Sequence, residues 1–161
     1  MTGDRMRMLL VDDDEGDILI CQEALKKLPF VHDMQVVRDG KKALDYLHKR
    51  PPFQKAFRPD LILLDINMPG LSGIDVLKQI KEDPNLKTIP VCMLTTSDAV
   101  QDVVGSYAAH ANCYITKPVQ LDQFLDAVRQ VTNFWTRLAT LPSLPKVEPK
   151  PGGAGTVTAK R

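Results

Sequence analysis

The chain has 161 residues, of which 43% are hydrophobic and 25% are charged, and its net charge is +1. This length and balance are typical of one ordinary globular domain. A charge near zero gives no long-range attraction to nucleic acid or to an anionic membrane, and no apolar run approaches the ~20 residues that a membrane span needs. Acids follow Val11 directly, so no signal peptide is predicted. We therefore expect a cytoplasmic protein that binds neither nucleic acid nor membranes.

Short apolar runs alternate with segments in which apolar residues recur at helical spacing. Proline and Asp-Gly pairs separate many of these segments. The helix predicted over 98–110 has Ser97 or Asp98 as its expected N-cap. In chain order, the pattern predicts a strand over 6–11, a helix over 17–28, a strand over 34–37, a helix over 41–49, a strand over 61–64, a helix over 73–83, a strand over 90–95, a helix over 98–110, a strand over 113–116 and a helix over 120–138.

The predicted strands consist of nearly uninterrupted apolar residues, which indicates strands that are buried on both faces. Such strands, alternating with helices, form a parallel sheet covered by helices on both sides. Right-handed crossovers favour a doubly wound five-stranded sheet, and the chain is too short for an eight-stranded barrel. We assign this α/β domain to residues 1–140 and a disordered Pro/Gly/Lys-rich tail to residues 141–161, while the segment 51–59 is predicted to be a surface insertion.

Polar side chains follow four of the predicted strands at the point where each strand ends. Asp12 and Asp13 follow the first strand, Asp65 the third and Lys117 the fifth, while Thr95 closes the fourth. In an open parallel sheet the carboxyl ends of the strands meet at one edge, where ligands bind. Each residue alone would be an unremarkable turn or capping residue. Their joint position predicts a functional site.

Three neighbouring carboxylates repel one another, and their pKa values rise unless a cation neutralises them. Magnesium suits such a site because it takes oxygen ligands and is usually held by one or two carboxylates together with a phosphate. A lysine and a hydroxyl beside the metal would stabilise a phosphoryl group, which a carboxylate oxygen can attack to form an acyl phosphate. Asp65 is therefore predicted to accept a phosphoryl group.

Four motifs carry a resemblance to a known family: "LLVDDDEGD", "PDLILLDINMPGLSGIDVLKQIK", "IPVCMLTTSD" and "CYITKPV". With them, residues 6–138 resemble the receiver domain of two-component response regulators, which implies a flavodoxin-like (βα)5 fold. Within that family the chain looks most like the small stand-alone regulators that partner phytochrome histidine kinases. The features behind this closer likeness are the loop "RPPFQKAFRPD", the run "SYAAHANCYITKPV" and the helix end "NFW".

The resemblance implies a metal site and a phosphorylated residue. Asp65 corresponds to the phosphorylated aspartate. Asp12 and Asp13 correspond to the acidic pair that binds Mg²⁺, and the backbone carbonyl of Asn67 to a further protein ligand. The implied partner is a sensor histidine kinase, expected to be a bacterial phytochrome.

The resemblance also implies a switch. Thr95 corresponds to the hydroxyl that moves toward the phosphoryl group, and Lys117 to the lysine that contacts a phosphoryl oxygen. Tyr114 takes the place of the aromatic residue that turns inward upon activation, although a plain packing role on the fifth strand is an alternative. Thr96 is larger than the small residue usual after the switch hydroxyl, which puts access to the site and the phosphoryl lifetime in question.

The expected protein is a signalling phosphoacceptor rather than an enzyme, with self-phosphorylation from small phosphodonors and autodephosphorylation. A haloacid-dehalogenase-type phosphatase is the main alternative, but it needs a general acid two residues after the nucleophile, where this chain has Asn67. A flavodoxin-like FMN binder would place the FMN phosphate against the acids that follow the first strand. An unphosphorylated receiver-like module would usually lack part of the acid–lysine set.

Phe134 and Trp135 cannot both face the core, because neighbouring helical residues point about 100° apart. We expect them to form an association surface, with a homodimer built from the fourth helix, the fifth strand, the fifth helix and the C-terminal extension. Since no effector domain follows in this sequence, the output is expected to be protein contact or phosphate delivery. Three cysteines are predicted to be reduced core thiols, namely Cys21, Cys92 and Cys113.

Overall fold

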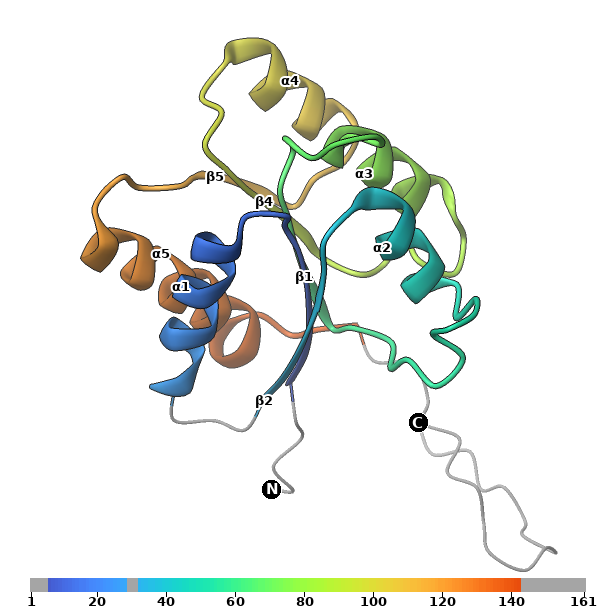
Figure 1. Ribbon diagram of the computed structural model, residues 1–161, viewed down its shortest axis with the longest axis horizontal. Coiled ribbons are helices and arrows are strands. Elements are labelled where there is room, and N and C mark those ends of the chain that lie inside the picture. The colour runs from blue at the N-terminus through green and yellow to red at the C-terminus, as the bar shows by residue number, and fades with distance from the viewer. Residues whose placement is uncertain (1–5, 29–31, 143–161) are drawn as a thin grey trace, which may run out of the picture.

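A computed structural model describes residues 6–28 and 32–142 of the chain. Five parallel strands form one sheet in the order β2-β1-β3-β4-β5, which confirms the doubly wound α/β prediction (Figure 1). β1 and β2 run in register over their full length, and β1 also pairs with β3 on its other side. The strands are β1 (Met6–Val11), β2 (His32–Val37), β3 (Leu61–Leu64), β4 (Val91–Thr95) and β5 (Cys113–Thr116).

Helices cover both faces of this sheet (Figure 1). α1 and α5 pack against each other on one side, while α2 and α3 pack together on the other side, next to α4. Within the described ranges, no helix is long and apolar enough to cross a membrane. The helices are α1 (Glu15–Lys26), α2 (Gly40–Leu47), α3 (Gly73–Glu82), α4 (Val100–Ala108), α5 (Leu121–Asn133) and the π-helical segment η1 (Phe134–Leu138).

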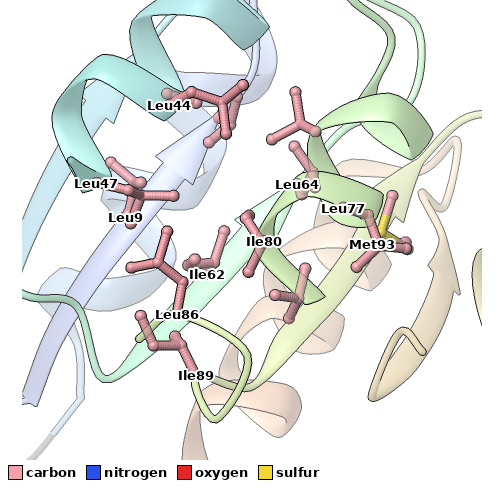
Figure 2. Packing of buried hydrophobic residues seen from close by; sticks show 14 of the residues in the cluster. Leu9, Leu44, Leu47, Ile62, Leu64, Leu77, Ile80, Leu86, Ile89 and Met93 are labelled. Atoms are coloured by element: carbon pink, nitrogen blue, oxygen red, sulfur yellow. The ribbon is translucent and has the colours of Figure 1, made fainter. Parts of the chain in front are cut away.

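The core divides into two clusters because successive strand side chains point to opposite faces of the sheet. In β3, Ile62 and Leu64 enter the cluster under α2 and α3, while Leu61 and Leu63 enter the cluster under α1 and α5. All four side chains are fully buried. Figure 2 shows Ile62 and Leu64 among the first cluster. Full burial of such a side chain contributes about 1.5–3 kcal/mol, so the central strand anchors the edge that follows it.

The predicted cap of α4 is wrong. The N-cap residue is Ala99, which offers no side-chain cap hydrogen bond. The Ser97 hydroxyl instead accepts from the Ala99 N–H and donates to the Asp102 carboxylate. Ser97 thus stabilises the loop that leads into α4, because the helix begins only at Val100, two residues later than predicted.

The predicted last helix is also too long as an α-helix. α5 ends at Asn133, and residues 134–138 continue as a π-helical turn. Two hydroxyls bond to carbonyls four residues earlier: Thr132 Oγ1 donates to Val128 O and Thr136 Oγ1 donates to Thr132 O, each at 2.7 Å. Such bonds compete locally with the regular backbone pattern, and π-helical turns are frequent at functional surfaces.

The segment 51–59 is more than a connecting surface loop. The rings of Phe53 and Phe57 pack edge-on against Tyr46 of α2, with centroids 5.4 and 5.8 Å away. Arg7 of β1 lies over Phe57, 5.7 Å from the ring centroid. Aromatic pairs of this geometry contribute about 0.5–1.5 kcal/mol beyond burial. The insertion is therefore anchored to α2 and to the start of the sheet.

Two further predictions concern single residues. Cys21 and Cys92 are buried thiols as expected, but Cys113 is only half-buried. Leu141, the first residue of the predicted tail, packs against the cluster under α1 and α5. The rest of the predicted tail, from residue 143 onward, lies outside the described residues.

Candidate functional site

The backbone of the sheet sets the positions of Asp12, Asp65 and Lys117. Each residue lies one position beyond its strand, yet its amide still joins the sheet. Three side chains that are far apart in the sequence are therefore held at one edge by the same hydrogen-bond pattern as the strands. The bonds run from Asp12 N to Val37 O at 3.1 Å, from Asp65 N to Val11 O at 3.0 Å and from Lys117 N to Thr95 O at 2.7 Å.

The ammonium of Lys117 lies at the centre of the site. Its Nζ donates to Asp12 Oδ2 at 2.8 Å, to Asp17 Oδ2 at 2.8 Å and to Asp65 Oδ2 at 3.3 Å. The lysine side chain is 3% exposed, and those of Asp12 and Asp65 are 1% and 7% exposed. The predicted convergence of Asp12, Asp65 and Lys117 is thus present as direct contacts among buried charges.

Burial and ion pairing shift the pKa values of these charged groups in opposite directions. Burial alone would lower the pKa of Lys117, but hydrogen bonds with Asp12 and Asp17 and the nearby negative charges outweigh it and raise that pKa above its ordinary value. Burial raises the pKa of Asp12, although the hydrogen bond and charge of Lys117 oppose this shift. Lys117 therefore keeps its charge in the folded protein and helps to keep the Asp12 carboxylate ionised.

Asp12, Asp13 and Asp65 form a group that suits a divalent cation. Each offers one carboxylate oxygen, and these oxygens lie within 4.8 Å of one another. Asp12 and Asp65 are buried while Asp13 is exposed, which gives the site an open side. Asn67 is exposed beside them, and its N–H donates to Asp65 Oδ1 at 3.4 Å. Oxygen ligands with one open side fit a hard cation that keeps part of its water shell.

The predicted switch residues meet at Ser97. The Thr95 hydroxyl is fully buried and accepts from the Ser97 N–H at 3.4 Å, while the Tyr114 hydroxyl donates to Ser97 O at 2.8 Å. Among the residues that the structure describes, the Thr95 hydroxyl makes no hydrogen bond with Asp65. Tyr114 is half-buried and packs against the cluster under α2 and α3. The β4–α4 loop thus connects the two residues. Thr96 is exposed.

Asp17 is a member of the site that sequence reasoning missed. It lies in the first turn of α1, and its N–H donates to the carboxylate of Asp14, the helix N-cap, at 2.9 Å. Asp17 is the third residue of the helix that follows the acids at the end of β1, so its first turn starts close to the site. The short distance in sequence from Asp12 and Asp13 was the available signal. The apolar pattern of the helix did not include this position.

Phe134 and Trp135 lie on a different surface from the acidic site. Phe134 is 46% exposed, and its ring packs edge-on against Trp135 with centroids 5.1 Å apart. Trp135 is half-buried against the cluster under α1 and α5. The two residues line a groove of about 560 Å³ between β5 and α5, together with Cys113 and Gln130. The prediction that the two side chains cannot both face the core is correct, since Trp135 packs against it and Phe134 is exposed.

This strand order, with acids and a lysine at the carboxyl edge, is that of flavodoxin-like signalling domains, which bind their ligands where the strand order reverses. Residues 8–129 match the family model of the response regulator receiver domain, well over half of the chain. The chain therefore belongs to the response regulator receiver family, the signalling proteins of two-component systems.

Individual relatives agree with this assignment. Response regulator Rcp1 of Synechocystis sp. is 41% identical over 136 residues, which cover 84% of this chain and 92% of the relative. The crystal structure of a phosphorylated cyanobacterial phytochrome response regulator, RcpA, has a TM-score of 0.85 and 45% identity, covering 87% of this chain and 100% of that one. The Mn²⁺-bound form of Rcp1 has a TM-score of 0.83 and 40% identity, covering 86% and 99%.

Family membership has two general consequences. Receiver domains bind a divalent metal in their acidic pocket, and the carboxylates of Asp12, Asp13 and Asp65 fit that use. Their partners are histidine kinases. The haloacid-dehalogenase alternative is not favoured, because the matched family is a different one and position 67 carries an asparagine.

Proposed function

We propose that Asp65 accepts a phosphoryl group from the phosphohistidine of a sensor histidine kinase. The observation that carries the proposal is the contact of the buried Lys117 ammonium with both Asp12 and Asp65, which joins three strand ends in one charged site. A carboxylate oxygen of Asp65 attacks phosphorus as the N–P bond breaks, and the imidazole nitrogen leaves with the electron pair. Water later cleaves the acyl phosphate and restores the carboxylate.

The remaining residues orient and stabilise the phosphoryl group. Lys117 contacts one phosphoryl oxygen with its ammonium, and the Thr95 hydroxyl donates to another. Asp12, Asp13, Asp65 and the backbone carbonyl of Asn67 are the groups that we assign to Mg²⁺, which neutralises phosphoryl charge when bound.

The signal passes from Thr95 to the surface of α4, β5 and α5. When the Thr95 hydroxyl turns toward the phosphoryl group, it leaves the Ser97 N–H, and the Tyr114–Ser97 bond transmits the shift to β5. The β4–α4 loop would then have two arrangements, and phosphorylation would shift the equilibrium between them. The same site supports self-phosphorylation by small donors and autodephosphorylation.

Replacement of Asp65 by asparagine is expected to abolish labelling. Wild-type protein incubated with Mg²⁺ and acetyl phosphate should gain the mass of one phosphoryl group, and this gain should be labile in base because acyl phosphates hydrolyse. Intact-mass spectrometry measures the gain. Asp122→Asn, which removes an exposed acid of α5, is the matched control and should be labelled like the wild type. Unchanged labelling of Asp65→Asn would overturn the proposal.

We also propose a bacterial phytochrome as the kinase. The support is the similarity to RcpA, a cyanobacterial phytochrome response regulator, and to Rcp1. A cytoplasmic location and a receiver domain over residues 1–140 with a tail over 141–161 stay predictions from the sequence.

We further propose a homodimer through α4, β5, α5 and the C-terminal extension. Support comes from large apolar side chains that remain exposed on these elements, including Val100, Val104 and Tyr107 of α4 at 74%, 61% and 50%. The groove lined by Phe134 and Trp135 lies between β5 and α5, two other elements of the proposed interface. Apolar patches of this kind mark association sites more often than free surface.

Trp135→Ala is expected to weaken the dimer at least tenfold, because aromatic residues at the centre of an interface often contribute about 2 kcal/mol or more. Sedimentation equilibrium of wild-type and variant protein measures the dissociation constant. Leu19→Ala removes an exposed apolar side chain from α1 and serves as the control. A Trp135→Ala protein with an unchanged dimer constant would contradict this interface.

A further inference from the structure

The Lys117 ammonium divides its hydrogen bonds unequally among three carboxylates. Its two shorter bonds, both 2.8 Å, go to Asp12 and Asp17, and the longest, 3.3 Å, goes to Asp65. An ammonium has three N–H donors, so these bonds use all of them. The residue that should be phosphorylated is thus the weakest partner of the lysine, and a residue of α1 takes up one donor.

We propose that Asp17 is a positioning residue that holds the Lys117 ammonium away from Asp65, so that the Asp65 carboxylate stays available to a divalent cation and to a phosphoryl group. This inference rests on the proposed function and names a device that regulates the same site.

The location of Asp17 suits such a role. The Asp14 cap fixes the first turn of α1 through its bond to the Asp17 N–H, so the carboxylate is presented from a rigid element. The side chain of Asp17 is 22% exposed, whereas those of Asp12 and Asp65 are almost fully buried. Asp17 therefore keeps part of its hydration and holds the lysine at a lower desolvation cost than a third buried acid would.

Removal of the Asp17 carboxylate frees one N–H of Lys117. Of the two carboxylates that remain, Asp12 is already at 2.8 Å, whereas Asp65 Oδ2 is at 3.3 Å and can come closer. We expect the ammonium to move onto it, because a buried donor without a partner is costly. A lysine that is closely paired with Asp65 then competes with a cation for the same oxygens.

The consequence can be measured without any phosphodonor. Asp17→Asn in the full chain is expected to weaken Mn²⁺ binding roughly tenfold, because the competing ammonium is drawn onto a cation ligand in a partly buried site. Mn²⁺ is titrated while the electron paramagnetic resonance signal of the free aqueous ion is followed, and circular dichroism verifies that each variant is folded. Asp14→Asn removes the same charge at the residue next to Asp13 and keeps a capping residue, so it reports the general charge effect.

The effect of Asp17→Asn in the wild-type protein and in a Lys117→Met protein shows whether Asp17 acts through the lysine. In a Lys117→Met background, loss of Asp17 should lower Mn²⁺ affinity no more than Asp14→Asn does, since the competing ammonium is absent. Asp17→Glu keeps the carboxylate and should recover most of the lost affinity, which gives an independent test if the Lys117→Met protein does not fold.

Three results would overturn the inference. The first is an Asp17→Asn effect equal to that of Asp14→Asn, and the second is an effect that persists without Lys117, since Asp17 would then act on the cation directly. The third is an Asp17→Glu protein as weak as Asp17→Asn. Failure of the proposed function would appear elsewhere, as wild-type protein that binds Mn²⁺ but gains no phosphoryl group.

Discussion

Replacement of Gly73 by alanine is expected to lower the free energy of unfolding by roughly 2–3 kcal/mol, the upper part of the ~1–3 kcal/mol that extra atoms forced into filled space typically cost. Gly73 is the first residue of α3, and its N–H donates to Ile66 O at 2.9 Å. A Cβ at this position would lie 2.7 Å from the Asp65 carbonyl carbon and 2.7 Å from Ile66 Cα, with the Asp65 carbonyl oxygen closer still. These neighbours are backbone atoms, so no side-chain rotation can relieve the clash.

The clash should also displace the proposed phosphoacceptor. The Asp65 N–H bonds to Val11 O, which holds the residue in the sheet, so a shift of its carbonyl must be absorbed at the end of β3. As a second result, we expect acetyl phosphate to label Gly73→Ala more slowly than the wild type. Both proteins are compared at a urea concentration at which the variant is folded.

Gly105→Ala is the matched control for both measurements. Gly105 lies inside α4, and a Cβ there would approach only Ile74 Cδ1, at 3.8 Å. Alanine in an open helical position is more favourable than glycine by about 0.5–1 kcal/mol. Urea denaturation should therefore show a lower free energy of unfolding for Gly73→Ala than for the wild type and a higher one for Gly105→Ala. Equal stability of wild type and Gly73→Ala would contradict the close packing of α3 on the strand end.

Sequence reasoning located the acidic site because that site depends on strand ends. Continuous apolar runs reveal buried parallel strands, and the carboxyl ends of such strands share one edge. This rule brings together Asp12 and Lys117, which are 105 positions apart, without any knowledge of loop structure. Asp65 follows the central strand, so the same rule brings it to that edge.

The same reasoning could not find contacts that depend on where an exposed turn points. Asp17 occupies a polar position of α1, and helical periodicity identifies only the buried face. Its contact with Lys117 depends on how the first turn of α1 lies over β1. The close approach of Gly73 to Asp65 likewise depends on how tightly the β3–α3 loop folds back, and the anchoring of Phe57 depends on the path of a long insertion.

Replacement of Lys117 by methionine is expected to lower the free energy of unfolding by roughly 3 kcal/mol at neutral pH without divalent cations, because removing one partner leaves buried charge uncompensated. The lysine side chain is 3% exposed and contacts three carboxylates, of which those of Asp12 and Asp65 are almost fully buried. Methionine keeps an unbranched apolar chain of similar length, so the change removes mainly the charge.

The stability loss caused by Lys117→Met should become smaller as pH falls. Burial raises the pKa of Asp12, and the hydrogen bond and charge of Lys117 hold that rise in check, so removal of the lysine raises the pKa further. A carboxyl group whose pKa is higher in the folded than in the unfolded state binds its proton more tightly when folded. Stability therefore increases as pH falls through the folded pKa toward the ordinary value of 3.8. Urea denaturation of wild type and variant between about pH 8 and about pH 5 measures this convergence.

Magnesium should separate the loss of charge from any loss of packing. The Lys117→Met protein is expected to gain more stability from added Mg²⁺ than the wild type does, since no ammonium competes for Asp12 and Asp65. Lys81→Met is the matched control, because within the described residues its Nζ bonds to uncharged oxygens alone, those of Lys87, Ile89 and Asn112. Its stability loss should not respond to Mg²⁺. A Lys117→Met deficit that is constant with pH and unaffected by Mg²⁺ would mean that Lys117 stabilises the fold by packing alone.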